Sequence, residues 1–129
     1  MRVLIVDDCE LSAGMLAVVL EIYGHKVQLC RSPNAGVRAA GDFRPEMVLL
    51  AISSPAEAAE LDAAEQLRCE CDVEPLLFAL CQAPGELDEA EQAVFDRVFP
   101  RPVRFGQLKP YLEKPLRVQR PAAEPVRNA

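Results

Sequence analysis

Short apolar segments alternate with longer segments of helical periodicity along most of this chain. The apolar segments are bounded by turn residues and are typical of strands; they span residues 2–6, 26–30, 46–52, 76–81 and 97–99. The segments with helical spacing span residues 10–23, 32–41, 54–69, 86–95 and 104–114. Five strands that each lead into a helix predict an α/β fold, with a parallel sheet, helices on both faces and right-handed connections.

Several residues indicate where the helices begin and end. Ser32–Pro33 and Ser54–Pro55 each place an N-cap residue before a proline at the first helical position. Pro110 interrupts the last helical segment, so it either bends this helix or marks its start. Gly24 ends the first helix, which carries apolar residues at helical spacing, namely Leu11, Met15, Val18, Val19 and Ile22.

The residues that follow the strands are the candidates for function. In an open α/β sheet the ligand crevice lies beyond the carboxyl ends of the strands, where the strand order reverses. Around it we expect the residues at the ends of four predicted strands, namely Asp7, Asp8, Ala51, Leu80, Cys81, Pro100 and Arg101. Two acids end the first strand, whereas the third strand ends in Ala51 with no carboxylate. The pattern is that of a site for a divalent cation and a phosphoryl group whose central acid is missing.

Composition and charge exclude several classes of protein. The 129 residues are enough for one domain with a sizeable core. No apolar run approaches the roughly 18 residues of a membrane span. No signal peptide precedes the first strand, so we expect a cytoplasmic protein with reduced cysteines. The net charge of −6 argues against nucleic-acid binding.

The charge is spread unevenly along the chain. Residues 57–96 hold twelve acids and one base, whereas residues 97–129 hold eight bases and two acids. An acidic body with a basic end is typical of a docking surface, but equally of a solvated face followed by a basic tail.

Three segments resemble the receiver domain of response regulators in two-component signalling. They are residues 1–8 (Met-Arg-Val-Leu-Ile-Val-Asp-Asp), 23–27 and 44–50, and the pair Arg101–Pro102 adds to them. The resemblance covers residues 1–114. It implies a flavodoxin-like (βα)5 fold: a doubly wound parallel sheet of strand order 2-1-3-4-5 in three αβα layers, without enzymatic activity. Residues 115–129 hold three prolines and no apolar period, so we expect a disordered tail or a linker.

As this resemblance implies, the chemistry of the family needs five groups. These are an acidic pair for Mg²⁺ after the first strand, a carboxylate nucleophile after the third and a hydroxyl residue after the fourth. The fifth strand carries an aromatic residue and is followed by a lysine. Asp7 and Asp8 match the acidic pair. The other positions are altered, and they are occupied by Ala51, by Leu80 or Cys81, by Val98 and by Arg101.

The missing carboxylate argues against a bound cation, because Mg²⁺ takes octahedral oxygen ligands and the methyl group of Ala51 offers none. Asp7 and Asp8 remain as candidate ligands, but we expect neither a metal nor another cofactor. We hypothesise instead that Arg101 neutralises these acids through a charge-assisted hydrogen bond and closes the crevice in one conformation.

Two serines allow a different interpretation of the crevice. Ser53 and Ser54 follow Ala51 and could accept a phosphoryl group from a shifted position. A shifted acceptor loses the in-line geometry of phosphoryl transfer, and Ser54 before Pro55 is better explained as a helix cap.

The cysteines and the single histidine have simple structural interpretations. Cys9 and Cys81 border the crevice and suggest redox sensing as an alternative to buried, unreactive thiols. Cys69 and Cys71 form a C-x-C pair without a second pair, which is poor zinc spacing. His25 is expected to be a solvated turn residue.

A protein-interaction surface is the remaining candidate. The resemblance implies signalling through the face formed by the fourth helix, the fifth strand and the fifth helix, often in symmetric dimers. In this chain the expected face comprises Glu89, Glu91, Arg97, Val98, Arg104 and Lys109. The opposite charges on these elements could pair across a two-fold axis or within one molecule.

The sequence therefore indicates an atypical receiver, or pseudo-receiver. We expect a phosphorylation-independent interaction and dimerisation module in signal transduction, whose partner is an effector domain, a kinase or another regulator. Two alternatives stay open, namely a phosphoryl-accepting receiver with a displaced acceptor and a sensor of a small ligand in the vacated crevice.

Overall fold

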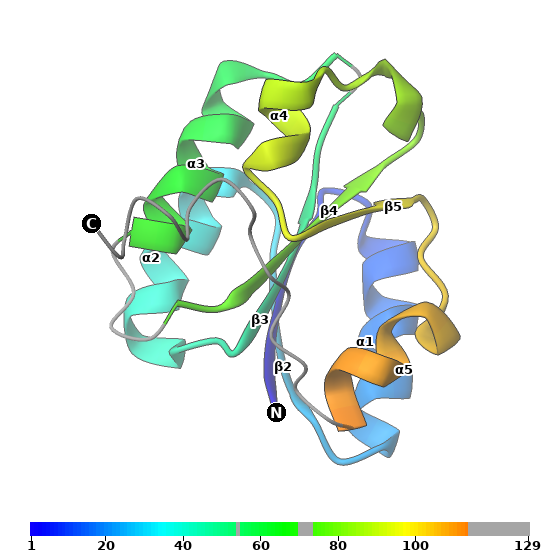
Figure 1. Ribbon diagram of the computed structural model, residues 1–129. Helices are drawn as coiled ribbons and strands as arrows, with labels where there is room; N and C mark the ends of the chain where they lie inside the picture. Colours follow the sequence, from blue (N-terminus) through cyan, green and yellow to red (C-terminus); the bar gives the residue numbers. More distant parts are fainter. Residues whose placement is uncertain (54, 70–73, 114–129) are drawn as a thin grey trace, which may run out of the picture.

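A five-stranded parallel sheet with helices on both faces forms the centre of the molecule (Figure 1). The computed structural model describes residues 1–53, 55–69 and 74–113. The strands are β1 (Arg2–Val6), β2 (Lys26–Cys30), β3 (Met47–Ala51), β4 (Leu76–Cys81) and β5 (Arg97–Pro100). They pair in the order β2-β1-β3-β4-β5. The predicted α/β class, the doubly wound three-layer architecture and the strand order 2-1-3-4-5 are confirmed.

Two apolar clusters lie on opposite faces of the sheet. On one face α1 (Glu10–Ile22) and α5 (Phe105–Glu113) pack against side chains such as Ile5, Leu49 and Phe78. On the other, α2 (Pro33–Phe43) and α3 (Ala58–Cys69) pack against side chains such as Val6, Leu50 and Ala79. Successive strand residues point to opposite faces, so the uninterrupted apolar runs of the central strands supply both clusters.

The first two helices begin and end largely as expected. The Oγ of Ser32 accepts a hydrogen bond from the backbone N–H of Ala35 at 3.2 Å, so the predicted N-cap is confirmed. Gly24 ends the preceding helix with a φ of 92° that favours glycine. The helix α2 continues past Gly41 to Phe43, and Arg44 caps its end with a left-handed φ of 53°.

The third helix begins later than predicted. It starts at Ala58, and Pro55 lies before it in an exposed bend, whereas Ser54 lies outside the described residues. The helix start is set by Glu60, whose carboxylate accepts a hydrogen bond from the backbone N–H of Glu57 at 2.9 Å. A glutamate that reaches back three residues satisfies an N–H group that has no partner within the helix.

The predicted fourth helix over residues 86–95 is wrong in its extent. A 3-10 turn, η1 (Pro84–Glu86), comes first, and α4 (Glu89–Ala93) follows after a break. Asp88 caps α4 in a capping box with Glu91, since each side chain accepts from the backbone N–H of the other. This Asp-x-x-Glu signal was present in the sequence and marks the true start.

The last helix, α5, spans Phe105–Glu113 with Pro110 inside it. Pro110 therefore does not mark the start of the helix. Pro110 is exposed, so water can satisfy the carbonyl that loses its intrahelical partner. Stacking of Tyr23 on Phe105, with ring centroids 4.5 Å apart, joins α5 to the end of α1.

Four of the five apolar residues that the sequence places along α1 point away from the core, and the fifth, Val19, is half-buried. Ala13, Ala17 and Leu20 face the sheet and are buried, while Leu11, Met15, Val18 and Ile22 are exposed. Small residues let the helix approach the sheet closely, which turns the larger side chains outward.

The expected tail over residues 115–129 lies outside the described residues, and so does Lys114. Within the described ranges, no helix combines the length and the apolar character that crossing a membrane requires.

Candidate functional site

Two cavities that share residues lie at the carboxyl ends of the strands, where the crevice was expected. Their volumes are about 220 Å³ and about 270 Å³. The smaller cavity is lined by the candidate residues Asp7, Asp8, Ala51, Ser53 and Arg101, among others. The larger cavity shares Asp7 and Arg101 with it and adds Leu80. The fold thus brings most of the predicted residues together.

The two candidates for the hydroxyl position, Leu80 and Cys81, point to opposite faces of β4. Leu80 lines the larger cavity and lies beside Ala51 of β3. Cys81 is fully buried in the opposite apolar cluster and lines neither cavity. The expectation that Cys81 borders the crevice is therefore wrong, because strand residues alternate between faces. An apolar side chain stands beside Ala51.

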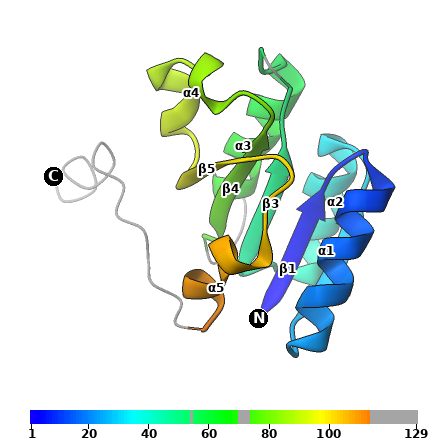
Figure 2. The same ribbon diagram turned by 90° about the vertical axis from the view of Figure 1, so that its right-hand side faces the viewer.

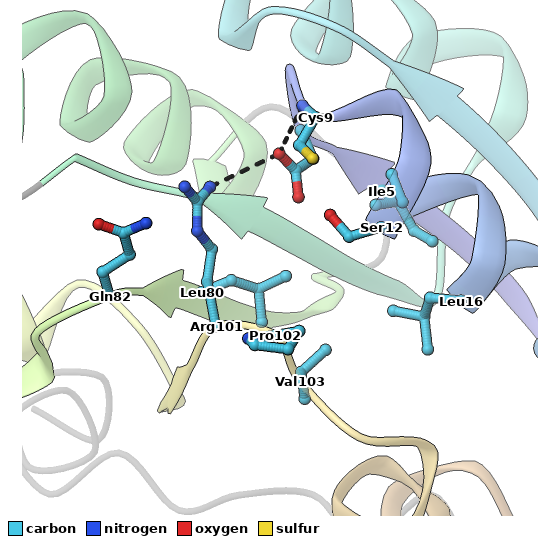
Figure 3. A pocket seen from close by; sticks show the side chains of 11 residues that line it. Ile5, Cys9, Ser12, Leu16, Leu80, Gln82, Arg101, Pro102 and Val103 are labelled. Atoms are coloured by element: carbon cyan, nitrogen blue, oxygen red, sulfur yellow. Dashed lines mark hydrogen bonds and ion pairs between the residues drawn. The ribbon is translucent and has the colours of Figure 1, made fainter.

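Arg101 is held at the crevice by the sheet that precedes it. Its backbone N–H donates to the carbonyl of Cys81 at 3.1 Å, which extends the β4–β5 pairing by one residue. From there the side chain reaches across the larger cavity toward the end of β1 (Figure 3). The arginine can therefore interact with acids on the far side of the crevice.

Arg101 forms an ion pair with Asp7, one of the two acids that it was expected to neutralise. The Nη1 of Arg101 lies 3.5 Å from Oδ1 of Asp7, and the side chains are 26% and 6% exposed, respectively (Figure 3). The same oxygen accepts a hydrogen bond from the backbone N–H of Cys9 at 3.0 Å. The 3.5 Å separation exceeds the roughly 2.7–2.9 Å of a charge-assisted hydrogen bond, so the expected hydrogen bond is corrected to an ion pair.

A further carboxylate at the crevice, that of Glu60, was not anticipated from the sequence. Glu60 lines the smaller cavity and is buried. Its two oxygens accept the backbone N–H of Ser53 at 2.9 and 3.0 Å, and its Oε2 accepts the Ser53 hydroxyl at 3.0 Å. Glu60 thereby ties the segment after β3 to the first turn of α3. The signal that could have found it is its position three residues after the N-cap of α3.

These contacts bear on Ser53 as a displaced acceptor. Ser53 is exposed and lines the smaller cavity, as expected. Its hydroxyl donates a hydrogen bond to the carboxylate of Glu60, which lines the same cavity. A carboxylate that receives the serine proton sits where an incoming phosphoryl group would meet negative charge.

The residues at the crevice do not fit a magnesium site. The side chain at the end of β3 is the methyl group of Ala51, and the Oδ1 of Asp7 is taken by Arg101 and by the N–H of Cys9. Asp8 is exposed. In residues 1–53, 55–69 and 74–113, no three His, Cys, Asp or Glu side chains are grouped so as to hold a metal ion. The octahedral oxygen set that Mg²⁺ prefers is not provided by these side chains.

The expected interaction face is only partly available for a partner. Glu89, Arg104 and Lys109 are exposed. Arg97 donates from its Nε to the hydroxyl of Tyr111 at 3.1 Å. The carboxylate of Glu91 belongs to the α4 capping box, and Val98 is half-buried against the core. Several predicted face residues thus have structural roles within the same molecule.

The cysteines divide into two kinds. Cys30 and Cys81 are buried, as expected for small apolar residues. Cys9 is exposed at the rim of the larger cavity, and hydrogen bonds from Ser12 lower the pKa of its thiol. Cys69 is also exposed, while Cys71 lies outside the described residues.

His25 is less solvated than predicted. It lies 3.3 Å from the terminal amine of Met1, and burial, followed by the positive charge of that amine, lowers the pKa of the imidazole. It precedes β2, at the opposite end of the strand from the crevice, and lines neither cavity.

No family model matches this sequence, and no curated protein matches it significantly. Solved receiver domains share its fold. A CheY-like response regulator receiver domain from Methylobacillus flagellatus gives a TM-score of 0.74 at 21% identity, over 88% of this chain and 96% of that chain. The response regulator TrrA from Thermotoga maritima, solved in complex with Mg²⁺-BeF, gives 0.73 at 18% identity, over 89% and 98%.

The signal receiver domain of a modulated diguanylate cyclase from Desulfovibrio desulfuricans gives a TM-score of 0.69 at 24% identity, over 87% of this chain and 90% of that chain. At these identities the likeness establishes the fold that the chain shares with receiver domains.

Proposed function

We propose that this chain is a pseudo-receiver that acts in signal transduction by binding proteins and that is independent of phosphorylation. The observation that carries the proposal is the methyl group of Ala51 at the end of β3, beside a pocket acid that Arg101 already neutralises. A phosphoryl acceptor needs a nucleophile placed in line with groups that hold the transferred oxygens. In this chain Ala51 offers no nucleophile, and Arg101 is paired with Asp7.

In this proposal the partner is another protein, namely an effector domain, a kinase or another regulator. The chain itself acts in the cytoplasm. Exposed charges of both signs on α4 and α5, such as Glu89 and Lys109, give such a partner an electrostatic surface. Exposed ion pairs contribute only about 0–1 kcal/mol each, so contacts of apolar side chains must add to the affinity.

The experiment is incubation of the wild-type chain with acetyl phosphate and Mg²⁺, followed by intact mass measurement. We expect no phosphoryl adduct, while a conventional receiver treated in parallel gains one. An adduct on the wild-type chain would overturn the proposal. If the adduct then disappeared in a Ser53→Ala variant, the displaced-acceptor alternative would be established in its place.

A small-ligand sensor is the second candidate, and the larger cavity favours it. Apolar side chains such as Ile5, Leu16 and Val103 line its walls, with the Asp7–Arg101 pair at one side. Its volume of about 270 Å³ is near the lower limit of ligand pockets, which begin at about 300 Å³. A rise in Tm with one member of a nucleotide panel, lost in Leu80→Trp, would favour this function over the first.

A further inference from the structure

The large hydrophobic side chains that are exposed among the described residues lie in one part of the chain. In the described part of the chain all six large exposed hydrophobic residues lie between positions 11 and 29. Four of them are on α1 and are named here the α1 stripe; they are Leu11 at 76%, Met15 at 65%, Val18 at 55% and Ile22 at 74% exposure. Of the other two, Tyr23 directly follows the end of α1, and Leu29 lies on the edge strand β2.

The α1 stripe faces directly away from the sheet. The stripe lies opposite the buried residue Leu20 on the helix, at 100° per residue. Figure 2 shows α1 at one margin of the molecule. Between Glu10 and Glu21 the helix has no charged residue at all. A helix with apolar residues on both its inner and its outer face is typical of a helix that is covered on both, so the outer face of α1 is suited to a partner.

The spacing of the stripe identifies the shape of that partner. Its four residues are separated by four, three and four positions, which is the spacing of the a and d positions along the seam between two packed helices. Beside the stripe, Gly14 has no atom within 4 Å of the place where a Cβ would be, so a second helix can approach closely. The complement of the α1 stripe is therefore another apolar helix face.

We propose that this helix is α1 of a second copy of the chain, packed antiparallel about a two-fold axis between Met15 and Val18. The four-three-four spacing is the same from either end of the helix. An antiparallel pair therefore places Leu11 against Ile22 of the second copy and Met15 against Val18 of the second copy. In an isologous contact of this kind each interaction occurs twice, once on each side of the two-fold axis.

The charges at the two ends of α1 agree with the antiparallel direction. Arg31 lies 3.1 Å from Glu10 at the amino end, and both side chains are exposed. Glu21 follows Glu10 by eleven residues, about three turns, and so lies on the same flank of the stripe. Antiparallel packing brings Arg31 of one copy toward Glu21 of the other, and the helix dipoles also oppose each other favourably.

Two further residues enlarge the contact beyond a single helix. Leu29 pairs in register with Ile5 on the face of the sheet that α1 covers, and it lies toward the amino end of α1. Tyr23 lies at the opposite end of α1. In the antiparallel pair each Leu29 comes toward Tyr23 of the second copy, which extends the area toward that of a stable dimer. The contact is separate from the crevice, so it holds whether or not the crevice accepts a phosphoryl group.

The test is sedimentation equilibrium of the full 129-residue chain. We expect a reversible dimer whose Kd rises at least about thirtyfold in Met15→Glu and in Val18→Glu, because each places a charge at the centre of the contact. Circular dichroism checks that both variants stay folded, which their exposed positions favour. The matched control is Lys109→Glu on α5, which is expected to leave the Kd unchanged.

Two charge variants test the direction of packing. Glu21→Arg and Arg31→Glu are each expected to raise the Kd several-fold, and the double variant to restore it. A wild-type chain that is monomeric at about 100 μM overturns the proposal. So does a dimer that Lys109→Glu weakens and the stripe variants leave intact, since that dimer would use the α4–β5–α5 face. A chain that dimerises only after residues 114–129 are removed also overturns it, because residues 114–129 of the same chain would then cover the α1 stripe.

Discussion

The methyl group of Ala51 lines the same cavity as Asp7, Asp8 and Arg101, on the strand beside Leu80. At the scale of single residues, these side chains determine what the crevice can bind. Asp7 is neutralised by Arg101, whose Nη1 lies 3.5 Å from its Oδ1, and Asp8 is exposed to water. The side chain of Ala51 at the end of β3 offers no oxygen with which either acid could share a cation.

The substitution Ala51→Asp tests this account of the crevice. A carboxylate at the end of β3 adds a third oxygen donor, so the affinity for Mg²⁺ is expected to rise by about tenfold or more. Isothermal titration calorimetry measures it, and Ala51→Asn serves as the uncharged control of equal size. Adding Arg101→Lys should raise the affinity further, because the compact ammonium neutralises Asp7 less effectively. Equal affinities in the Asp and Asn variants would contradict the account.

The exposed thiol of Cys9 provides a second prediction at this scale. Hydrogen bonds from Ser12 lower the pKa of Cys9, so at pH 7.5 more of it is thiolate than an ordinary cysteine would have. Ser12→Ala is expected to raise that pKa and to slow alkylation by iodoacetamide a few-fold, as followed by mass spectrometry. Cys30 is the internal control, since burial raises its pKa and shields it. An unchanged rate at Cys9 in Ser12→Ala would contradict the role of Ser12.

At the scale of the secondary-structure elements, close packing between α2 and β1 depends on one glycine. A Cβ added at Gly36 would lie 2.6 Å from the Cγ2 of Val6, a buried, β-branched side chain that cannot easily move. Gly41 on the same helix has no atom within 4 Å of its Cβ position. Glycine at position 36 therefore allows the helix to lie against the sheet.

Substitution of these two glycines should have opposite effects. Gly36→Ala is expected to lower the free energy of unfolding by about 1–3 kcal/mol through overpacking. Gly41→Ala is expected to raise it by up to about 1 kcal/mol, because alanine favours the helix and restricts the unfolded chain. Urea unfolding of both variants beside the wild type measures the difference. A stabilising Gly36→Ala would show that Val6 can move aside.

Element boundaries show what local sequence can and cannot predict. The capping of α2 by Ser32 follows from adjacent residues and was predicted correctly. The start of α3 was misplaced because Ser54–Pro55 has the same local pattern, yet the buried Glu60 supports a start at Ala58. A cap signal is local, whereas the choice between two such signals depends on which one the fold can bury.

At the scale of the whole molecule, α1 is a helix with apolar side chains on both its buried and its exposed side. One side packs on the sheet through small residues, and the other carries the α1 stripe into solvent. A dimer built on the stripe links folding to association, because the partner binds the folded chain and not the unfolded one.

The thermal stability of the protein should therefore depend on its concentration. We expect the Tm of the wild type to rise by a few degrees over a hundredfold increase in protein concentration. Differential scanning calorimetry of Met15→Glu should give a Tm that is independent of concentration. A concentration-dependent Tm in that variant as well would mean that the chains associate through another surface.

The sequence by itself determined the α/β alternation, the strand positions and the lack of a carboxylate at Ala51, because periodicity and residue identity are local properties of the chain. The sequence also predicted that Asp7 and Arg101 lie at one crevice, because the carboxyl ends of parallel strands meet at one edge of the sheet. Only the tertiary structure decided that Cys81 points into the core, that Glu60 ties down the segment after β3, and that α1 turns its larger apolar side chains outward. Which side of an element is buried depends on how closely it can approach its neighbours, and that is a property of the packed molecule.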